Sequence, residues 1–303
     1  MQENNNLAPI VLFVYNRLDH TKQTIEALQK NYLASESELF IYSDAAKNPE
    51  AKHAVNAVRA YLKSVDGLKK VSIIERDKNW GLASSIIDGV TTVVNEYDKI
   101  IVLEDDLVTS PYFLTFMNQS LDIYSDKKKV WHISGWNYDL ELHTKEEAFF
   151  WRAMNCWGWA TWKDRWSYYK KDVDAVLQNF TKQQKRDFTL NNTIPNLWEQ
   201  VVANKTGQIN TWAIFWSASI FEQHGLCLNP VVSYVENTGL DGSGTHGDVV
   251  QKCTQNINEG LIKRFPQSIE ENKDIVQIIG EYSRSQFLPL HQKIINKIKR
   301  ILR

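Results

Sequence analysis

The chain has 303 residues, 43% of them hydrophobic, and carries 35 basic and 36 acidic side chains for a formal net charge of −1. A chain of this length can bury one large core or two modest ones, and its near-neutral charge argues against binding to nucleic acid. Its three cysteines lie far apart with no C-x-x-C pair, which argues against a disulfide framework or a zinc site and indicates a reducing, cytoplasmic compartment.

Apolar runs and amphipathic segments alternate along the first part of the chain. The apolar runs predict strands over residues 10–15, 39–42, 71–74 and 100–103. Apolar residues at helical spacing predict helices over 19–30, from Pro49 to Val65, and over 82–97. Short apolar strands joined by helices predict an α/β fold, in which a mostly parallel sheet is covered by helices on both faces.

Polar side chains follow each of the four predicted strands. Ligands of parallel sheets bind outside the carboxyl ends of the strands, so we expect these side chains to line a site. Arg17 or Arg76 could contact a phosphate, and Asp44 could accept hydrogen bonds from a base or a ribose. The sequence has neither a G-x-G-x-x-G after the first strand nor a P-loop, so it predicts a nucleotide site of another kind.

Three carboxylates, Glu104, Asp105 and Asp106, directly follow the fourth apolar run. Carboxylates this close repel one another, so the arrangement needs a cation or several hydrogen-bond donors. Mg²⁺ and Mn²⁺ prefer carboxylate oxygens and are often held by one or two of them together with phosphates and water. The run therefore predicts a metal-bound phosphate ligand. The alternative is that these carboxylates cap a helix opened by Ser110 and Pro111.

Seven of the eleven tryptophans lie within residues 131–166. A tryptophan ring can stack on the C–H face of a sugar while its N–H donates to a hydroxyl. For any single tryptophan the alternative is packing in the core. Trp157 and Trp159, on either side of Gly158, are the strongest candidates for a sugar contact.

An Asp-Asp pair after a fourth strand resembles the D-x-D-type motif of the GT-A sugar-nucleotide glycosyltransferases, which binds Mn²⁺ or Mg²⁺ and the donor diphosphate. The run from Glu104 to Leu107, followed by Pro111-Tyr112-Phe113, is similar to the metal segment of the N-acetylglucosaminyltransferase I family. The resemblance implies a GT-A fold, with a Rossmann-like sheet, flanking helices, a mixed acceptor-side region and a C-terminal helix. It also implies that Asp106 is the direct metal ligand.

Further segments match that family in order over residues 8–248. Residues 134–137 (Ser-Gly-Trp-Asn) resemble its S-A-W-N turn, residues 157–159 its L-G-W loop near the donor sugar, and residues 239–247 its late glycine-rich segment. Asp77 stands where the family has a nucleotide-contacting His. The resemblance implies nucleotide contacts from Asn16, Arg17, Asp44, Asp77, Asn79, Glu104 and Asp105. It implies metal contacts from Asp106 and His246, and sugar contacts from Trp136, Asn137, Trp157, Trp159 and Thr245. His246 could bind the diphosphate instead, and its loop is either a lid over the donor or an ordinary surface loop.

The general base is the point where the sequence departs from the family. The family's W-D-D-W run has its nearest counterpart in residues 209–212 (Ile-Asn-Thr-Trp), which contain no carboxylate. An inverting transfer, which we favour, needs a general base within reach of the acceptor hydroxyl, and Asp241 and Glu199 are the substitutes we consider. Without such a base the reaction would be retaining, with the leaving diphosphate assisting the acceptor.

The two ends of the chain bear on its location. The polar start predicts neither a signal peptide nor a membrane-spanning segment. Residues 288–303 place isoleucines on one stripe with lysines and arginines around it, which predicts a basic amphipathic helix. Such a helix either lies on an anionic membrane or docks on its own domain. We expect a GT-A domain over residues 1–248, with a nucleotide- and metal-binding half at 8–140 and an acceptor-side half at 141–248, and an extension at 249–303.

These patterns together predict a metal-dependent glycosyltransferase. We expect a UDP-sugar such as UDP-GlcNAc as donor, a hydroxyl of a carbohydrate or lipid-linked glycan as acceptor, and a role in bacterial surface polysaccharide synthesis at the inner face of the plasma membrane. One alternative is a sugar nucleotidyltransferase, which the lack of a glycine-rich, lysine-containing loop after the first strand disfavours. Another is a non-catalytic carbohydrate-binding protein, which would not need the three carboxylates.

Overall fold

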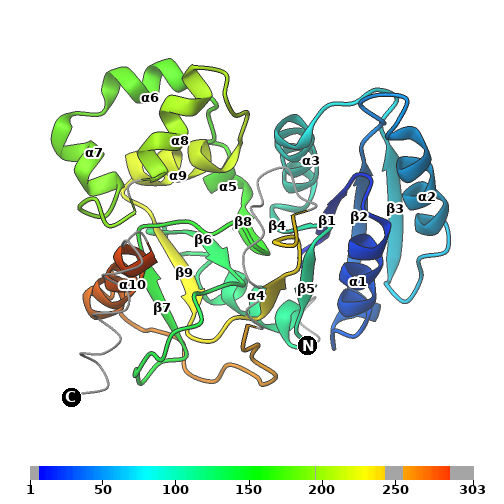
Figure 1. Ribbon diagram of the computed structural model, residues 1–303. Helices are drawn as coiled ribbons and strands as arrows, with labels where there is room; N and C mark the ends of the chain where they lie inside the picture. Colours follow the sequence, from blue (N-terminus) through cyan, green and yellow to red (C-terminus); the bar gives the residue numbers. More distant parts are fainter. Residues whose placement is uncertain (1–6, 195, 243–254, 287–303) are drawn as a thin grey trace.

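The computed structural model describes residues 7–194, 196–242 and 255–286, which form a mixed α/β structure (Figure 1). Its main sheet has eight strands in the order β3-β2-β1-β4-β8-β6-β9-β7, and a small second sheet pairs β5 with β10. The predicted fold class is confirmed. The division of the chain at residues 140 and 248 stays a prediction.

The first half of the sheet is parallel. Strands β1 (Ile10–Val14), β2 (Glu38–Ser43), β3 (Lys70–Glu75) and β4 (Lys99–Glu104) are joined by helices α1 (Leu18–Gln29), α2 (Lys52–Leu62) and α3 (Leu82–Tyr97), with the short helix η1 (Ala34–Glu36) before β2. The helix predicted from Pro49 to Val65 is shorter at both ends. Pro49 lies in a turn, and its carbonyl accepts from the Lys52 amide. The amides of Ser64 and Val65 each donate to the carbonyl three residues earlier, and these tighter turns end the helix.

Alternate side chains of β1 enter two different cores because successive residues of a strand point to opposite faces. Ile10 and Leu12 pack with α1 and α2, whereas Val11 and Phe13 pack with α3. The α3 helix approaches the sheet closely at Gly89, where an added Cβ would lie 2.8 Å from the Phe13 ring. Helices therefore cover both faces of the parallel strands, as predicted.

The second half of the sheet is mixed. Strand β8 (Trp159–Trp162) runs antiparallel to both β4 and β6 (Val130–Ser134) and so joins the two halves. Strand β9 (Leu226–Pro230) pairs parallel with β6 and antiparallel with β7 (Ala148–Trp151). The resemblance implies such a mixed region, and its role on the acceptor side stays a prediction.

The remaining elements surround this sheet. Between β4 and β6 come β5 (Leu107–Thr109) and α4 (Phe113–Ile123), and β10 (Val235–Asn237) follows β9. Between β8 and β9 the chain forms α5 (Lys163–Trp166), α6 (Val173–Asn179), α7 (Lys182–Phe188), α8 (Asn196–Lys205) and α9 (Ala213–Glu222). Figure 1 shows α6 to α9 gathered at one end of the molecule, where they share a small core of their own.

The last described helix, α10 (Lys273–Gln286), lies beside β7 (Figure 1). Its approach is fixed by the amide of Asn272, which donates to the Phe150 carbonyl of β7 at 2.8 Å. None of the helices in the described ranges is long and apolar enough to cross a bilayer. The predicted basic amphipathic helix lies in residues 287–303, outside the described part of the chain.

Candidate functional site

The carboxyl ends of β1 and β4 lie side by side, because Phe13 of β1 is in register with Glu104 of β4. The residues that follow the two strands are therefore neighbours. Arg17 directly precedes α1, and Asp105 and Asp106 form the turn into β5. Since β5 separates the carboxylates from α4, and the Leu114 amide in the first turn of α4 donates to Oδ1 of Asn31, the alternative that these carboxylates cap the helix is wrong.

The guanidinium of Arg17 donates to both aspartates. Its Nη2 contacts Oδ1 of Asp105 and lies 2.8 Å from Oδ2 of Asp106, while Nε lies 3.5 Å from Oδ2 of Asp105. Burial acts to lower the pKa of Arg17, but the charges of Asp105 and Asp106 outweigh it and raise the pKa, so Arg17 stays charged. Arg17 thus forms a bridge between the carboxylates of Asp105 and Asp106 in the described structure.

One guanidinium does not balance three carboxylates. Burial, followed by the charges of Asp106 and Asp105, raises the pKa of Glu104 to about 8, although Arg17 opposes the shift. Burial also raises the pKa of the Asp105 carboxyl against the opposing effect of Arg17. The cluster therefore favours additional positive charge, which would stabilise its ionised form.

Residues 238 and 239, which follow β10, lie against this cluster. The amide and the hydroxyl of Thr238 donate to the Asp106 carbonyl at 2.8 and 3.1 Å. Gly239 follows, and a Cβ added there would lie 2.1 Å from Oδ2 of Asp106 and 3.0 Å from Nη1 of Arg17. The absence of a side chain at Gly239 is what allows the segment to lie against the carboxylate.

Asp241 lies near the same carboxylate cluster, where it contacts His20 of α1. The His20 Nε2 atom lies 3.3 Å from the Thr238 carbonyl oxygen and 3.2 Å from Oδ2 of Asp241. Sequence reasoning missed His20. Its place in the first turn of the helix predicted over 19–30 is a signal that could have found it, because that turn follows the end of a parallel strand, where ligands bind.

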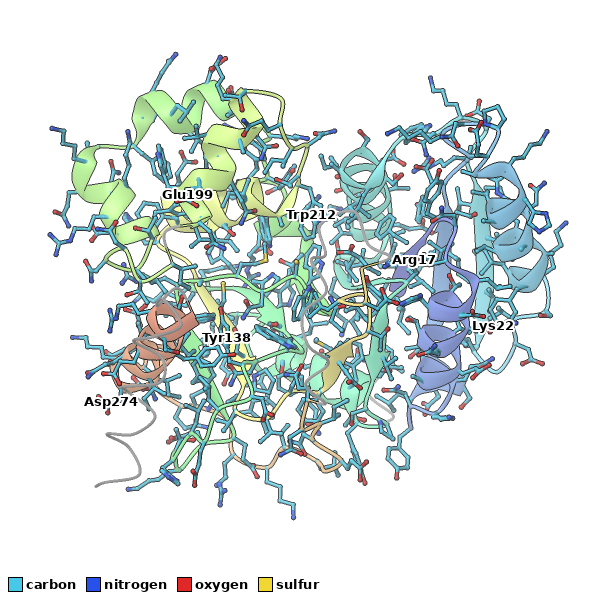
Figure 2. All side chains as sticks on the ribbon, viewed as in Figure 1. Arg17, Lys22, Tyr138, Glu199, Trp212 and Asp274 are labelled. Atoms are coloured by element: carbon cyan, nitrogen blue, oxygen red, sulfur yellow. The ribbon has the colours of Figure 1, made fainter. Side chains whose placement is uncertain are left out.

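The other candidate base is elsewhere. Glu199 is exposed on α8, and Figure 2 shows it within the cluster of α6 to α9, well separated from Arg17. The structure therefore brings Asp241, and not Glu199, to the carboxylate cluster.

The residues at this edge suit a divalent cation shared with a phosphate. Asp106 offers carboxylate oxygens, the ligands that Mg²⁺ and Mn²⁺ prefer. Nη1 of Arg17 is buried with no acceptor among the described residues, and it could donate to a phosphate oxygen. Within the described ranges no group of three or more His, Cys, Asp or Glu side chains is arranged around a metal position. Thr245 and His246 lie outside those ranges.

Asp44 ties β2 to the start of α3. Its Oδ1 accepts from the amides of Ala45 and Trp80, both at 2.9 Å, and its Oδ2 accepts from the Gly81 amide at 2.8 Å and from Nδ2 of Asn79 at 3.0 Å. These donors hold the loop that precedes α3. The expected nucleotide contacts of Asp44 and Asn79 stay predictions, as do those of Asn16, which is half-buried, and Asp77, which is exposed.

Arg76, at the end of β3, is held within the protein. Its guanidinium carbon lies 4.0 Å from the ring centre of Trp80 and 4.9 Å from that of Tyr42, and its Nη2 pairs with Asp88. Arg17 is therefore the arginine that the structure brings to the carboxylates.

The candidate sugar-binding residues fall into two groups. Trp136 and Trp157 are half-buried and meet edge to face, with ring centres 4.6 Å apart. Trp159 is 1% exposed and stacks on Trp212, and Asn137 is fully buried and donates to the Val231 carbonyl. The structure thus gives Trp159 and Asn137 packing roles, and the sugar contacts of all four stay predictions.

Comparison with known proteins gives one sequence match. Residues 10–124 match the sequence model of glycosyl transferase family 2. No curated protein matches the chain. The sequence match ends shortly after α4 and includes Arg17 and all three carboxylates.

The solved structures that are similar to this chain include the following two. The mannosyltransferase PcManGT from Pyrobaculum calidifontis, in complex with GDP-Man and Mn²⁺, is 10% identical with a TM-score of 0.39, over 72% of this chain and 71% of that one. TarS of S. aureus is 9% identical with a TM-score of 0.42, over 77% of this chain and 37% of that one. The resemblance to the N-acetylglucosaminyltransferase I family stays a prediction.

Proposed function

Because residues 10–124 match the sequence model of glycosyl transferase family 2, we propose that this chain transfers a sugar from a UDP-sugar, with UDP-GlcNAc as the first candidate, to a hydroxyl of a glycan. The observation that carries the proposal is the cluster of Arg17, Asp105 and Asp106 at the carboxyl ends of β1 and β4, where parallel sheets bind their ligands. A non-catalytic carbohydrate-binding protein would have no use for this cluster.

The donor diphosphate would lie at this cluster. Mn²⁺ or Mg²⁺ held by Asp106 would stabilise the negative charge that develops on the departing diphosphate. Arg17 would donate to the phosphate oxygens, and its unpaired Nη1 supports this role. Thr245 and His246 are proposed to contact the donor sugar and the metal or diphosphate from the glycine-rich segment.

We assign the general base to Asp241 in preference to Glu199. The Asp241 carboxylate would take the proton of the acceptor hydroxyl as its oxygen bonds to the anomeric carbon. The bond from that carbon to the diphosphate breaks, and the nucleoside diphosphate leaves with its electron pair, so the configuration is inverted. His20, 3.2 Å from Asp241, supports the assignment because it holds this carboxylate beside the cluster.

The acceptor is proposed to be a carbohydrate, free or attached to a lipid. Trp136 and Trp157 offer partly open aromatic surfaces on which a sugar ring could stack. The basic amphipathic pattern of residues 288–303 supports contact with an anionic membrane surface, which would bring the enzyme to a lipid-linked acceptor. A role in bacterial surface polysaccharide synthesis follows from this pairing of donor and acceptor.

The function is tested by thermal unfolding of the chain with UDP, GDP, CMP or dTDP, each with and without Mn²⁺. A nucleotide at about 100 times its dissociation constant should stabilise the fold by about 2.7 kcal/mol. We expect UDP to do so with Mn²⁺, and the effect to be lost in Asp106→Ala but kept in the control Asp126→Ala, a substitution of an exposed aspartate.

The other outcomes of this unfolding experiment would change or overturn the proposed function. A shift with GDP in place of UDP changes the donor and keeps the reaction class. Stabilisation by no nucleotide overturns the proposal and favours the carbohydrate-binding alternative. Release of UDP from a UDP-sugar and an acceptor, without consumption of a nucleoside triphosphate, separates the transferase from a nucleotidyltransferase.

A further inference from the structure

We propose that Arg17 is a built-in cation that competes with the divalent metal for Asp106, so that the nucleotide-free chain binds Mn²⁺ poorly and nucleotide and metal enter together. The inference rests on the proposed function, which supplies the nucleotide and the metal. It assigns to Arg17 a second role, in addition to contacting phosphate.

The first support is the position of the guanidinium. Nη2 of Arg17 lies 2.8 Å from Oδ2 of Asp106 and also contacts Asp105, and the Arg17 and Asp106 side chains are only 19% and 16% exposed. A metal ion binds a carboxylate oxygen at about 2.0–2.2 Å. On Oδ2 of Asp106 the ion would therefore meet a fixed positive charge that already uses the same oxygen, in a site where water screens little.

The second support is the incomplete bonding of Arg17. Its Nη1 is buried beside Gly239 and finds no acceptor among the described residues, although a guanidinium is most stable when both arms of its fork are bonded. A diphosphate presents the paired oxygens that match this fork. Arg17 therefore gains contacts by exchanging Asp106 for a phosphate, and the exchange frees Asp106.

The consequence is a coupling between the two ligands. The diphosphate takes the guanidinium away from Asp106, which makes the carboxylate available to the metal, and by linkage the metal raises the affinity for the diphosphate by the same factor. A direct bond between phosphate and metal produces coupling too. The feature that belongs to Arg17 alone is the obstruction of the metal site before any nucleotide is present.

The test is calorimetric titration of MnCl₂ into the full-length chain without nucleotide. Removing the guanidinium in Arg17→Gln should tighten Mn²⁺ binding about tenfold or more, a change of about 1.4 kcal/mol. The matched control is Lys22→Gln, which removes one positive charge from α1, the helix that follows Arg17. Its side chain contacts the Tyr61 ring and is labelled below and to the right of Arg17 in Figure 2. This control should bind Mn²⁺ as the wild type does.

Two double variants distinguish obstruction of the metal site by Arg17 from a simple effect of the site's net charge on Mn²⁺ binding. Arg17→Gln with Asp105→Asn removes one charge of each sign and should still bind Mn²⁺ more tightly than the wild type. Arg17→Gln with Asp106→Asn should lose the gain, because the metal would have lost its proposed ligand. If Arg17→Gln does not fold, Arg17→Lys carries the test. Lysine has a single donor atom in place of the fork, and Mn²⁺ binding should tighten at least threefold.

The inference is overturned if folded Arg17→Gln, or Arg17→Lys in its place, binds Mn²⁺ no more tightly than the wild type. It is equally overturned if the gain persists without Asp106. The first result leaves the proposed function untouched, and the second would withdraw Asp106 as metal ligand. The proposed transfer reaction itself depends on UDP and Mn²⁺ together stabilising the wild-type chain. Conversely, failure of every nucleotide in that experiment overturns the proposed function while the titration still reports on Arg17.

Discussion

Gly239 lies directly against the carboxylate of Asp106, 133 positions earlier in the chain, and a Cβ on Gly239 would sit 2.1 Å from Oδ2. That distance is far below any normal contact, so a side chain at Gly239 must displace either the carboxylate or the segment that carries Asp241. The proposed metal ligand and the proposed base are therefore linked through one glycine.

The substitution Gly239→Ala should weaken the binding of UDP with Mn²⁺ by about tenfold or more, because it moves Asp106, while overpacking lowers the stability by only about 1–3 kcal/mol. Binding is measured by calorimetry and stability by urea unfolding. Gly260→Ala is the control, since the nearest atom to its Cβ, Oδ1 of Asn258, would lie at an ordinary 3.5 Å. Unchanged binding in Gly239→Ala would contradict the expectation that the added methyl group displaces Asp106, and would mean that the segment carrying Asp241 moves in its place.

His20 should act on turnover through Asp241. His20→Ala removes the contacts to Asp241 and Thr238, so we expect kcat to fall about tenfold or more with little change in KM for the donor. His20→Gln, whose amide nitrogen can take the place of Nε2, should restore part of the loss. Steady-state kinetics of both variants measures the effect, and an equal loss in the two would argue against positioning by a hydrogen bond.

Asp44 should matter for stability because four donors converge on its carboxylate. Asp44→Ala leaves partly buried backbone amides unpaired and should lower the free energy of unfolding by about 1–3 kcal/mol. Asp77→Ala, in the exposed part of the same loop, should change it by less than about 0.5 kcal/mol. Urea unfolding of the two variants compares them directly. Equal effects would mean that the charge of the loop, and not the Asp44 bonds, is what matters.

His132 should make the fold sensitive to acid. Burial lowers the pKa of His132 to about 3, although its bond to the Asn155 carbonyl opposes the shift, and Nδ1 accepts from the Trp216 indole and so is not free to take a proton. The unfolded chain protonates this histidine near pH 6.5. Stability from this group is therefore complete above about pH 6.5 and is lost as the pH falls toward 3.

The measurement for His132 is the slope of unfolding free energy against pH between 4 and 6. The wild type should lose about 1.4 kcal/mol per pH unit more than His132→Gln, because one additional proton binds on unfolding. The other titrating groups are common to both proteins, so their contributions cancel. Parallel slopes would show that His132 is accessible to protons in the folded state.

The parallel half of the fold is readable from sequence because its signals are local. The apolar runs at β1, β2, β3 and β4 and the periodicity of α3 depend on neighbouring residues. The end of α2 was predicted less well, because Val65 continues the apolar stripe beyond Leu62 although the backbone already turns. Periodicity reports which residues are buried, and it does not report where the hydrogen-bond pattern changes.

The site was predicted in part for the same reason. Strand ends identify Arg17 and the carboxylates, since a parallel sheet must bring these positions together. The contacts of Gly239 and Thr238 with Asp106 depend on how β10 pairs with β5, and no spacing in the sequence encodes that pairing. Burial of Trp159 likewise results from β8 lying between β4 and β6.

The central position of β8 also limits how the molecule can move. Since β8 is hydrogen-bonded to β4 on one side and to β6 on the other, the two halves share one uninterrupted sheet. Rotating the two halves away from each other would break the hydrogen bonds of β8 along a full strand. In this respect the molecule differs from proteins whose lobes rotate about a flexible hinge. The continuous sheet therefore holds the strand ends that carry Arg17 and the carboxylates in a fixed arrangement.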